Sequence, residues 1–150
     1  MAATTTEAEL DRLRRAGLRP TRQRVALARL LFGSGAHPRP RHVTAEALRA
    51  ESARAGAKVS LATIYNTLRQ FTGAGLLRQV VVDSGPSYFD TNLAEHHHLY
   101  FEDSGELRDV DAAHVRVSGL PAAPRGTQVS RVDVVVRLRA KEVVRLRARK

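Results

Sequence analysis

The stretch SLATIYNTLRQFTGAGLL, residues 60–77, decides the first half of the fold. Its apolar side chains recur at helical spacing, which predicts a helix of about three turns. These side chains belong to Leu61, Ile64, Leu68 and Phe71. Ser60 stands just before them, where its hydroxyl can cap the free amides of the first turn. Gly73 and Gly75 are typical of a helix end, so the helix should finish there.

The opposite face of this predicted helix is polar. It carries hydroxyl, amide and guanidinium groups, from Thr63, Tyr65, Asn66, Thr67, Arg69 and Gln70. Such groups suit the base edges and phosphates of a DNA major groove. An ordinary solvated helix face has a similar composition, so this stretch alone leaves both interpretations open.

The charge of the chain is strongly positive and unevenly placed. The formal net charge is +10 over 150 residues, and residues 1–87 hold 14 Lys and Arg against 6 Asp and Glu. Residues 88–139 hold 6 against 8. This asymmetry indicates a polyanion partner, and DNA is favoured over a membrane because no basic amphipathic helix carries large aromatic anchors. A merely arginine-rich composition is the alternative.

Several classes of protein are excluded by what the sequence lacks. It contains no cysteine, which rules out disulfides and thiolate metal sites, including a structural zinc held by four cysteines. No apolar run approaches about 18 residues, and the N-terminus MAATTTEAELDRLRR does not resemble a secretory signal. We therefore expect a cytoplasmic protein that does not span a membrane.

The pattern before and after residues 60–77 predicts a winged helix-turn-helix domain over residues 1–90. Helices are expected at 7–16, from a cap at Thr21 to Leu31, and from a cap at Thr44 to Gly56. Strands at 76–82 and 87–90, with a turn at 83–86, would form the wing. Candidate phosphate contacts are Arg19, Arg22 and Lys58, and candidate contacts from the central helix are Ser60, Thr63, Tyr65, Asn66 and Arg69.

Residues 91–139 predict a small α/β unit, so the whole chain should be α+β. Short strands are expected at 99–101 and 107–110, and a longer one at 129–138. One dominant strand encloses little core, so this unit should complete its apolar face against a second copy of the chain. VVRLRAK at residues 135–141 recurs as VVRLRARK at residues 143–150, within the basic tail 140–150. We expect this tail to be a frayed end, or alternatively an arm that touches DNA.

Three consecutive histidines, His96 to His98, lie between the two predicted domains. On an extended segment, neighbouring side chains point to opposite sides, so His96 and His98 could share one centre while His97 points elsewhere. Imidazole binds zinc, iron and haem, although a polar hinge loop can hold histidines that bind nothing.

The motifs SLATIYNTL, LRPTRQRVALARLLF and HHHLYFEDSGEL, taken in order, resemble the ferric uptake regulator superfamily over residues 10–141. Within it they look most similar to the iron response regulator branch. The resemblance implies a homodimeric transcription regulator, mostly a repressor, that binds a double-stranded DNA operator and controls haem synthesis and iron homeostasis. The alternative within the superfamily is a sensor of manganese, zinc or peroxide.

The resemblance also implies a ligand set. By position it assigns a regulatory divalent metal, whether iron, manganese or zinc, to His42, Asp90, His96 and His98. Asp90 stands where relatives usually have glutamate. Haem, as an alternative or additional effector, would be bound by His96, His97 and His98.

A metal-dependent hydrolase built on the histidines and Asp90 is the rival from a different functional class. The sequence lacks an HExxH motif, a nucleophile elbow and a glycine-rich phosphate loop. We therefore expect that the protein is not an enzyme.

Overall fold

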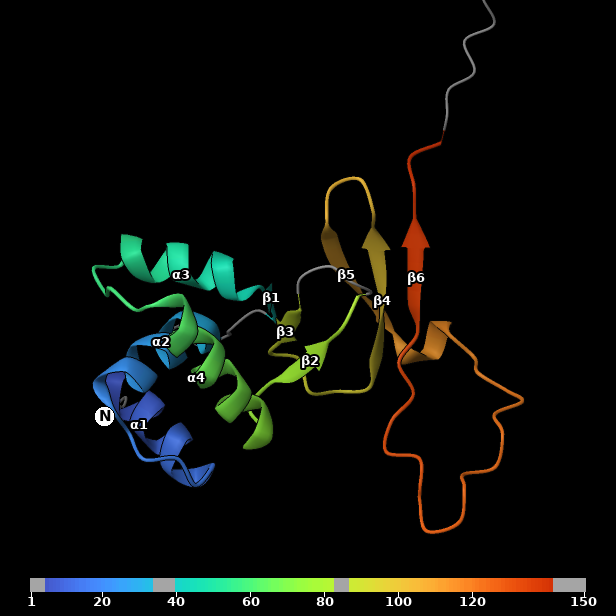
Figure 1. Ribbon diagram of the computed structural model, residues 1–150, viewed down its shortest axis with the longest axis horizontal. Coiled ribbons are helices and arrows are strands. Elements are labelled where there is room, and N and C mark those ends of the chain that lie inside the picture. Colours follow the sequence, from blue (N-terminus) through green and yellow to red (C-terminus); the bar gives the residue numbers. More distant parts are fainter. Residues whose placement is uncertain (1–4, 34–39, 83–86, 142–150) are drawn as a thin grey trace, which may run out of the picture. The chain divides into compact units, whose positions relative to one another are not determined.

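The computed structural model describes residues 5–33, 40–82 and 87–141 of the chain (Figure 1). They belong to two compact units, Met1–Ala94 and Glu95–Lys150. No helix in these ranges is long and apolar enough to cross a membrane.

Four helices make up most of unit 1, and each begins and ends within two residues of its predicted bounds. They are α1 (Thr5–Arg15), α2 (Arg22–Phe32), α3 (Ala45–Arg54) and α4 (Leu61–Gly73). The predicted caps are confirmed, because Thr21, Thr44 and Ser60 each accept a hydrogen bond from the backbone N–H three residues later.

The end of α4 follows from one glycine. Gly75 has φ of 80°, in the left-handed region that favours glycine. This turn lets the N–H of Gly75 donate to the carbonyl of Thr72 at 3.1 Å, and the N–H of Leu76 to that of Phe71 at 2.9 Å. These two bonds satisfy carbonyls that the helix would otherwise leave free.

The core of unit 1 forms around one face of α4. Ile64, Leu68 and Phe71 are fully buried, and they pack in one cluster with residues of the other helices: Leu13, Leu27, Leu31 and Leu48. The placement of Thr67 on the polar face was wrong. Thr67 is 5% exposed, because it shares the buried stripe with its neighbours three and four positions away. Its hydroxyl donates to the carbonyl of Thr63 at 2.8 Å.

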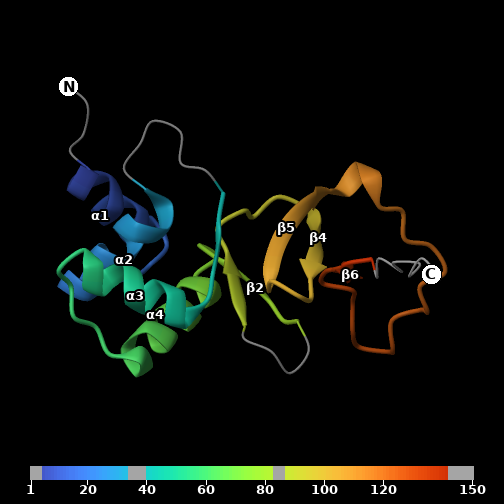
Figure 2. The ribbon, with the colours of Figure 1, turned by 90° about the horizontal axis from the view of Figure 1, so that it is seen from above.

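The wing of unit 1 is an antiparallel sheet with the order β1-β3-β2 (Figure 1), and its strand β2 is seen from a second side in Figure 2. β2 (Arg78–Val80) and β3 (Tyr88–Asp90) are the predicted hairpin in shortened form, and the predicted turn at 83–86 lies outside the described residues. β1 (His42–Val43) was not predicted. It pairs with β3 in a register that sets His42 opposite Asp90.

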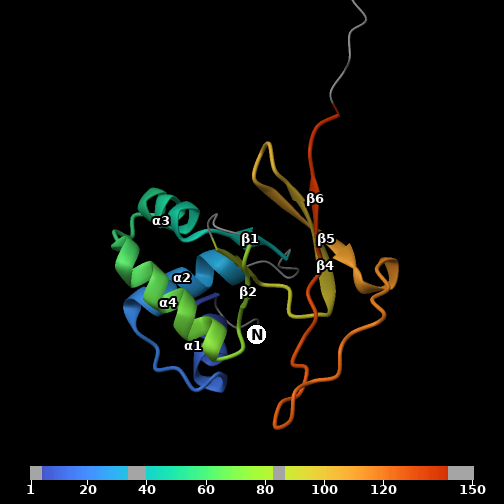
Figure 3. The same cartoon turned by 45° about the vertical axis from the view of Figure 1, so that its right-hand side comes forward.

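Unit 2 is organised around the hairpin of β4 (His96–Phe101) and β5 (Glu106–Asp111). β6 (Val135–Leu138) runs parallel to β4 on its other side, so the order is β5-β4-β6 (Figure 3). A single 3₁₀ turn, Ala112–His114, follows β5 in the described part of this unit. Together, the two units confirm the predicted α+β class.

The long strand predicted at 129–138 was wrong in extent. Only its last four residues are a strand, because only they pair with β4, from His98 to Phe101. A run of alternating valines has strand propensity, but a strand needs a neighbour for its backbone groups. Residues 142–150 of the basic tail lie outside the described residues, so its role stays a prediction.

Because Phe71 is fully buried at the centre of the α4 stripe, Phe71→Ala should lower the free energy of unfolding of unit 1 by about 3–5 kcal/mol. Urea denaturation followed by circular dichroism measures this. Arg69→Ala, on the exposed face of the same helix, is the matched control and should cost less than about 0.5 kcal/mol. Equal stability of the two variants would show that α4 is not held by this stripe.

Candidate functional site

The exposed face of α4 carries most of the predicted DNA contacts. Asn66, Arg69 and Gln70 are exposed, while Thr63 and Tyr65 are half-buried at the margins of the helix. Amide and guanidinium groups on one helix face can donate to and accept from base edges, and they can bind phosphate oxygens. This face is therefore chemically able to contact nucleic acid.

A polar groove runs along one side of this face, between α4 and the start of α2. It is lined by Arg19, Thr21, Gln23, Arg24, Thr63, Asn66, Thr67 and Gln70. Arg24 closes the groove, because its guanidinium donates to the carbonyl of Arg19 at 2.8 Å and to the amide oxygen of Gln70 at 2.9 Å. The predicted contacts Arg19, Thr63 and Asn66 thus share one groove, and Arg22 is exposed on the first turn of α2.

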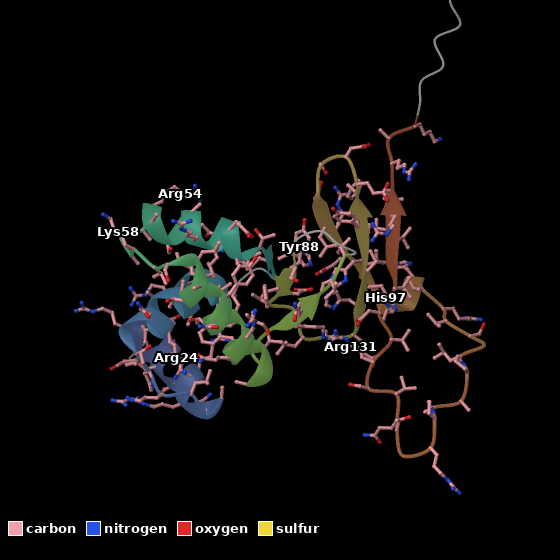
Figure 4. The ribbon with its side chains drawn as sticks, in the orientation of Figure 1. Arg24, Arg54, Lys58, Tyr88, His97 and Arg131 are labelled. Atoms are coloured by element: carbon pink, nitrogen blue, oxygen red, sulfur yellow. The ribbon has the colours of Figure 1, made fainter. Side chains whose placement is uncertain are left out.

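A second group of cations lies at the other end of α4. Lys58 lines a small pocket with Arg49 and Ser60, and Arg54 is exposed at the end of α3 (Figure 4). Arg49 and Arg54 were not among the predicted contacts. Both are exposed, and their nearness in the sequence to Lys58 is the signal that could have found them.

The hydroxyl of Ser60 is engaged in capping. It accepts from the backbone N–H of Thr63 at 3.2 Å and donates to the Thr63 hydroxyl at 2.9 Å. Both side chains therefore hold the first turn of α4 in place. A direct contact from Ser60 to DNA stays a prediction.

Tyr65 is held by an acidic residue of the neighbouring helix. Its phenol donates to the carboxylate of Glu46, in the first turn of α3, with the two oxygens 3.0 Å apart. This hydrogen bond, with some burial and the nearby negative charge, raises the pKa of Tyr65 above 10.0, so the phenol keeps its proton at neutral pH. The sequence analysis did not identify Glu46.

In unit 1, two of the predicted metal ligands lie together. His42 on β1 and Asp90 on β3 face each other across the sheet, with Nε2 of His42 3.2 Å from a carboxylate oxygen of Asp90. Asp90 is fully buried, and its other oxygen accepts from the backbone N–H of Asn92 at 2.8 Å. A buried carboxylate beside an imidazole is a suitable pair of ligands for a divalent ion.

In unit 2, the predicted ligands His96 and His98 lie on the same side of β4 and meet a third residue, Asp109 of β5. The Nε2 atoms of both histidines lie 3.4 Å from the same carboxylate oxygen of Asp109. Two donors about 2.1 Å from a tetrahedral ion are about 3.4 Å apart, so the three groups fit a divalent ion. Asp109 was missed, although the β4–β5 register, which sets it opposite His98, follows from the short turn between the strands.

His97 points away from this cluster, as predicted from the alternation of a strand. Its Nδ1 accepts from the backbone N–H of Val134 at 3.1 Å, just before β6 (Figure 4). The imidazole therefore supports the packing of β6 on β4, a role that the sequence did not indicate.

Comparison with known proteins agrees with this fold. The model of the Ferric uptake regulator family matches residues 15–137. The peroxide-responsive repressor PerR of Staphylococcus epidermidis is 35% identical over 103 residues, which cover 69% of this chain and 65% of that protein. The match thus spans just under two thirds of that repressor.

Solved structures are similar as well. The ferric uptake regulator from Pseudomonas aeruginosa with manganese is 31% identical, with a TM-score of 0.65 over 89% of this chain and 98% of that one. The ferric uptake regulator of Vibrio cholerae shares the fold at 24% identity, with a TM-score of 0.66 over 87% and 98%. Since the family model matches well over half of the sequence, the chain belongs to the ferric uptake regulator family.

Proposed function

We propose that the protein is a homodimeric, metal-responsive transcription regulator that binds operator DNA in the cytoplasm. The observation that carries this proposal is the α4 helix, which is fixed by a buried stripe and presents amides and guanidinium groups outward. Family membership supports a regulator over a metal-dependent hydrolase.

The distribution of cations supports DNA as the partner. Arg19 lies beside α4 in the polar groove, Arg22 is exposed on the first turn of α2, and Lys58 lies next to Ser60 at the start of α4. Within the described ranges none of these three side chains has a carboxylate partner, so each is available to a phosphate. Cations that flank a recognition helix would fix its register on the duplex, while the helix reads the bases.

Replacing Arg22 or Lys58 by alanine should therefore reduce the slope of log K against log salt by about 1 for each protomer. The measurement is fluorescence anisotropy on a duplex selected from a random library, over a range of potassium chloride concentrations. Arg125→Ala removes an exposed cation of unit 2 and serves as the control. If the slope is unchanged in all three variants, Arg22 and Lys58 do not contact phosphates and are ordinary solvated side chains.

For the effector, we propose a divalent ion bound by both ligand pairs. His96, His98 and Asp109 supply two imidazoles and a carboxylate in unit 2, and His42 and Asp90 supply one of each in unit 1. Iron, manganese and zinc all accept this mixture of nitrogen and oxygen donors. The five residues between Asp90 and His96 are enough to let one ion use ligands of both units.

Single alanine substitutions of His42 and of Asp109 should each weaken the binding of the same ion by roughly tenfold or more. Equilibrium dialysis of the full chain against manganese or zinc measures both affinity and stoichiometry. His114→Ala, an exposed histidine of unit 2, should bind as wild type does. Two ions per protomer, with each variant losing a different one, would show that the clusters are independent sites.

A divalent ion is favoured over haem by the surroundings of the histidine run. His96 and His98 are 5% and 1% exposed and face Asp109, whereas a porphyrin needs open space beside its axial ligand. His97 is engaged with the backbone of Val134. Because three histidines lie in sequence, haem nevertheless stays a candidate effector. Control of haem synthesis and iron homeostasis stays a candidate function with it.

Sensing of peroxide is the second candidate function. It is supported by the 35% identity to a repressor named for its response to peroxide. Titration of operator affinity with manganese, zinc, iron and haem, and with peroxide after iron loading, distinguishes these effectors.

The homodimer is supported by the small core of unit 2. In residues 95–141, Leu107 is the single hydrophobic side chain that is buried. Leu120 and Val129 are 53% and 58% exposed, and they line an apolar groove with Val132 and two prolines. Because such a surface is costly to leave in water, we propose that a second copy covers it.

Leu120→Asp combined with Val129→Asp should raise the dimer dissociation constant by at least about tenfold, since a buried charge without a partner opposes association. Sedimentation velocity of the full chain over a concentration series measures the change. Ser118→Asp adds one negative charge at an exposed residue nearby and should leave the dimer intact. A wild-type chain that stays monomeric at micromolar concentration would contradict the proposal.

A further inference from the structure

The contact between Tyr65 and Glu46 determines whether the tyrosine hydroxyl can donate or accept a further hydrogen bond. Its phenol oxygen lies 3.0 Å from the Glu46 carboxylate oxygen, and the two residues come from different helices, α4 and α3. A carboxylate can only accept, so the phenol must be the donor. The hydroxyl has one proton and two lone pairs, which leaves Tyr65 with acceptor capacity alone.

Both side chains are held where this contact requires them. Tyr65 packs against the core of unit 1 at the margin of the buried α4 stripe, next to the fully buried Ile64. Glu46 stands in the first turn of α3, between the buried Ala45 and Ala47, whose backbone N–H donates to the Thr44 hydroxyl. A carboxylate is also favoured at a helix N-terminus by the free N–H groups there. The hydrogen bond is therefore preorganised before any DNA arrives.

The polarity of the Tyr65 hydroxyl decides which bases it can contact. In the major groove, hydrogen-bond donors are the amino groups of adenine and cytosine, whereas guanine O6 and thymine O4 are acceptors. A free phenol could serve either kind of base edge. One that has given its proton to Glu46 can accept from an amino group, but it would meet guanine O6 or thymine O4 with lone pair against lone pair.

We propose that Glu46 is a positioning residue that sets sequence specificity, by fixing the Tyr65 hydroxyl as a hydrogen-bond acceptor that selects an adenine or cytosine amino group. This inference rests on the proposed function, because it needs α4 to lie in a major groove. The Glu46 carboxylate is exposed on α3 and brings negative charge toward the phosphates. The carboxylate therefore lowers the affinity of the protein for DNA of every sequence. It also restricts which base the protein accepts at one base pair.

Four full-length, zinc-loaded variants separate this role from a purely structural one. Tyr65→Phe removes the hydroxyl, Glu46→Ala frees its proton, and the double variant completes a cycle. Glu46→Gln is the matched control, because its amide oxygen can still accept the phenol proton although the charge is gone. Circular dichroism melting checks that each variant is folded.

The experiment selects bound duplexes from a library with a randomised central segment, and then measures the affinity of each protein for all four base pairs at every selected position. In wild type, one base pair should bind roughly tenfold better than the pair with its two bases exchanged, because the exchange puts a carbonyl acceptor where the amino group stood. Tyr65→Phe and Glu46→Ala should each reduce that preference to about twofold, and the double variant should reduce it no further. Glu46→Gln should keep the preference and bind all sequences more tightly at low salt.

Three results would overturn the inference. One is a Glu46→Ala protein that keeps the full wild-type preference, and another is a Glu46→Gln protein that loses it as Glu46→Ala does, since charge rather than hydrogen bonding would then set it. The third is a Tyr65→Phe protein that keeps the wild-type preference at every selected position. A wild-type protein that enriches no sequence from the library would instead overturn the proposed function itself.

Discussion

The buried stripe of α4 is the constraint on which unit 1 depends. Ile64, Leu68 and Phe71 are fully buried, and this fixes the rotation of the helix about its axis. Once the rotation is fixed, Asn66 and Arg69 must face outward. The caps at Ser60 and Gly75 then set the length of the helix, and hence how far its polar face extends. Packing thus determines the chemistry that the surface can offer, although none of the packed residues takes part in it.

In unit 2, a backbone register plays the corresponding part. The β4–β5 pairing sets His98 opposite Asp109, and the two-residue period of β4 brings His96 to the same side. A shift of one residue would turn His97 inward and send both ligand imidazoles to the other face. The turn that fixes this register is therefore as important to the ligand cluster as the ligands are. His97, on the other side, ties the strand to Val134, so one strand serves both the cluster and the packing of β6.

The sequence predicted most of the helical part of the fold, since caps, apolar spacing and terminal glycines act locally. It could not predict β1, because a two-residue strand has no periodicity and forms only where β3 lies beside it. The burial of Thr67 was missed for a different reason, since its position on the helical wheel, beside the apolar stripe, outweighs the polarity of its side chain. Asp109 and Glu46 become visible only when separate segments are folded together. Sequence patterns thus identified the candidate histidine ligands and Tyr65. Their partners Asp109 and Glu46 were identified only from the folded structure.

The same reasoning explains why the strand predicted at 129–138 is short. Alternating valines favour a β-strand, but a strand forms only where a neighbouring strand pairs with it. β4 pairs with four residues of this segment only. The exposed Leu120 and Val129 keep the sequence character of buried positions without being buried in one copy of the chain. An apolar segment that is exposed in a single protomer is expected where a second protomer covers it. The overlong strand prediction and the proposed dimer therefore rest on the same kind of observation, apolar side chains without a cover in one copy of the chain.

Within unit 1, the wing links the candidate ligands His42 and Asp90 to α4. Asp90 is paired in register with His42 on one side and with Arg78 on the other. Arg78 begins the strand that follows α4, and its guanidinium donates to the carbonyls of Leu93 and Ala94 at 3.1 and 3.3 Å. An ion that binds Asp90 would therefore act on a sheet that is joined covalently to α4 and bonded to the last residues of the unit. It can change DNA affinity only if it binds one arrangement of these elements more tightly than another.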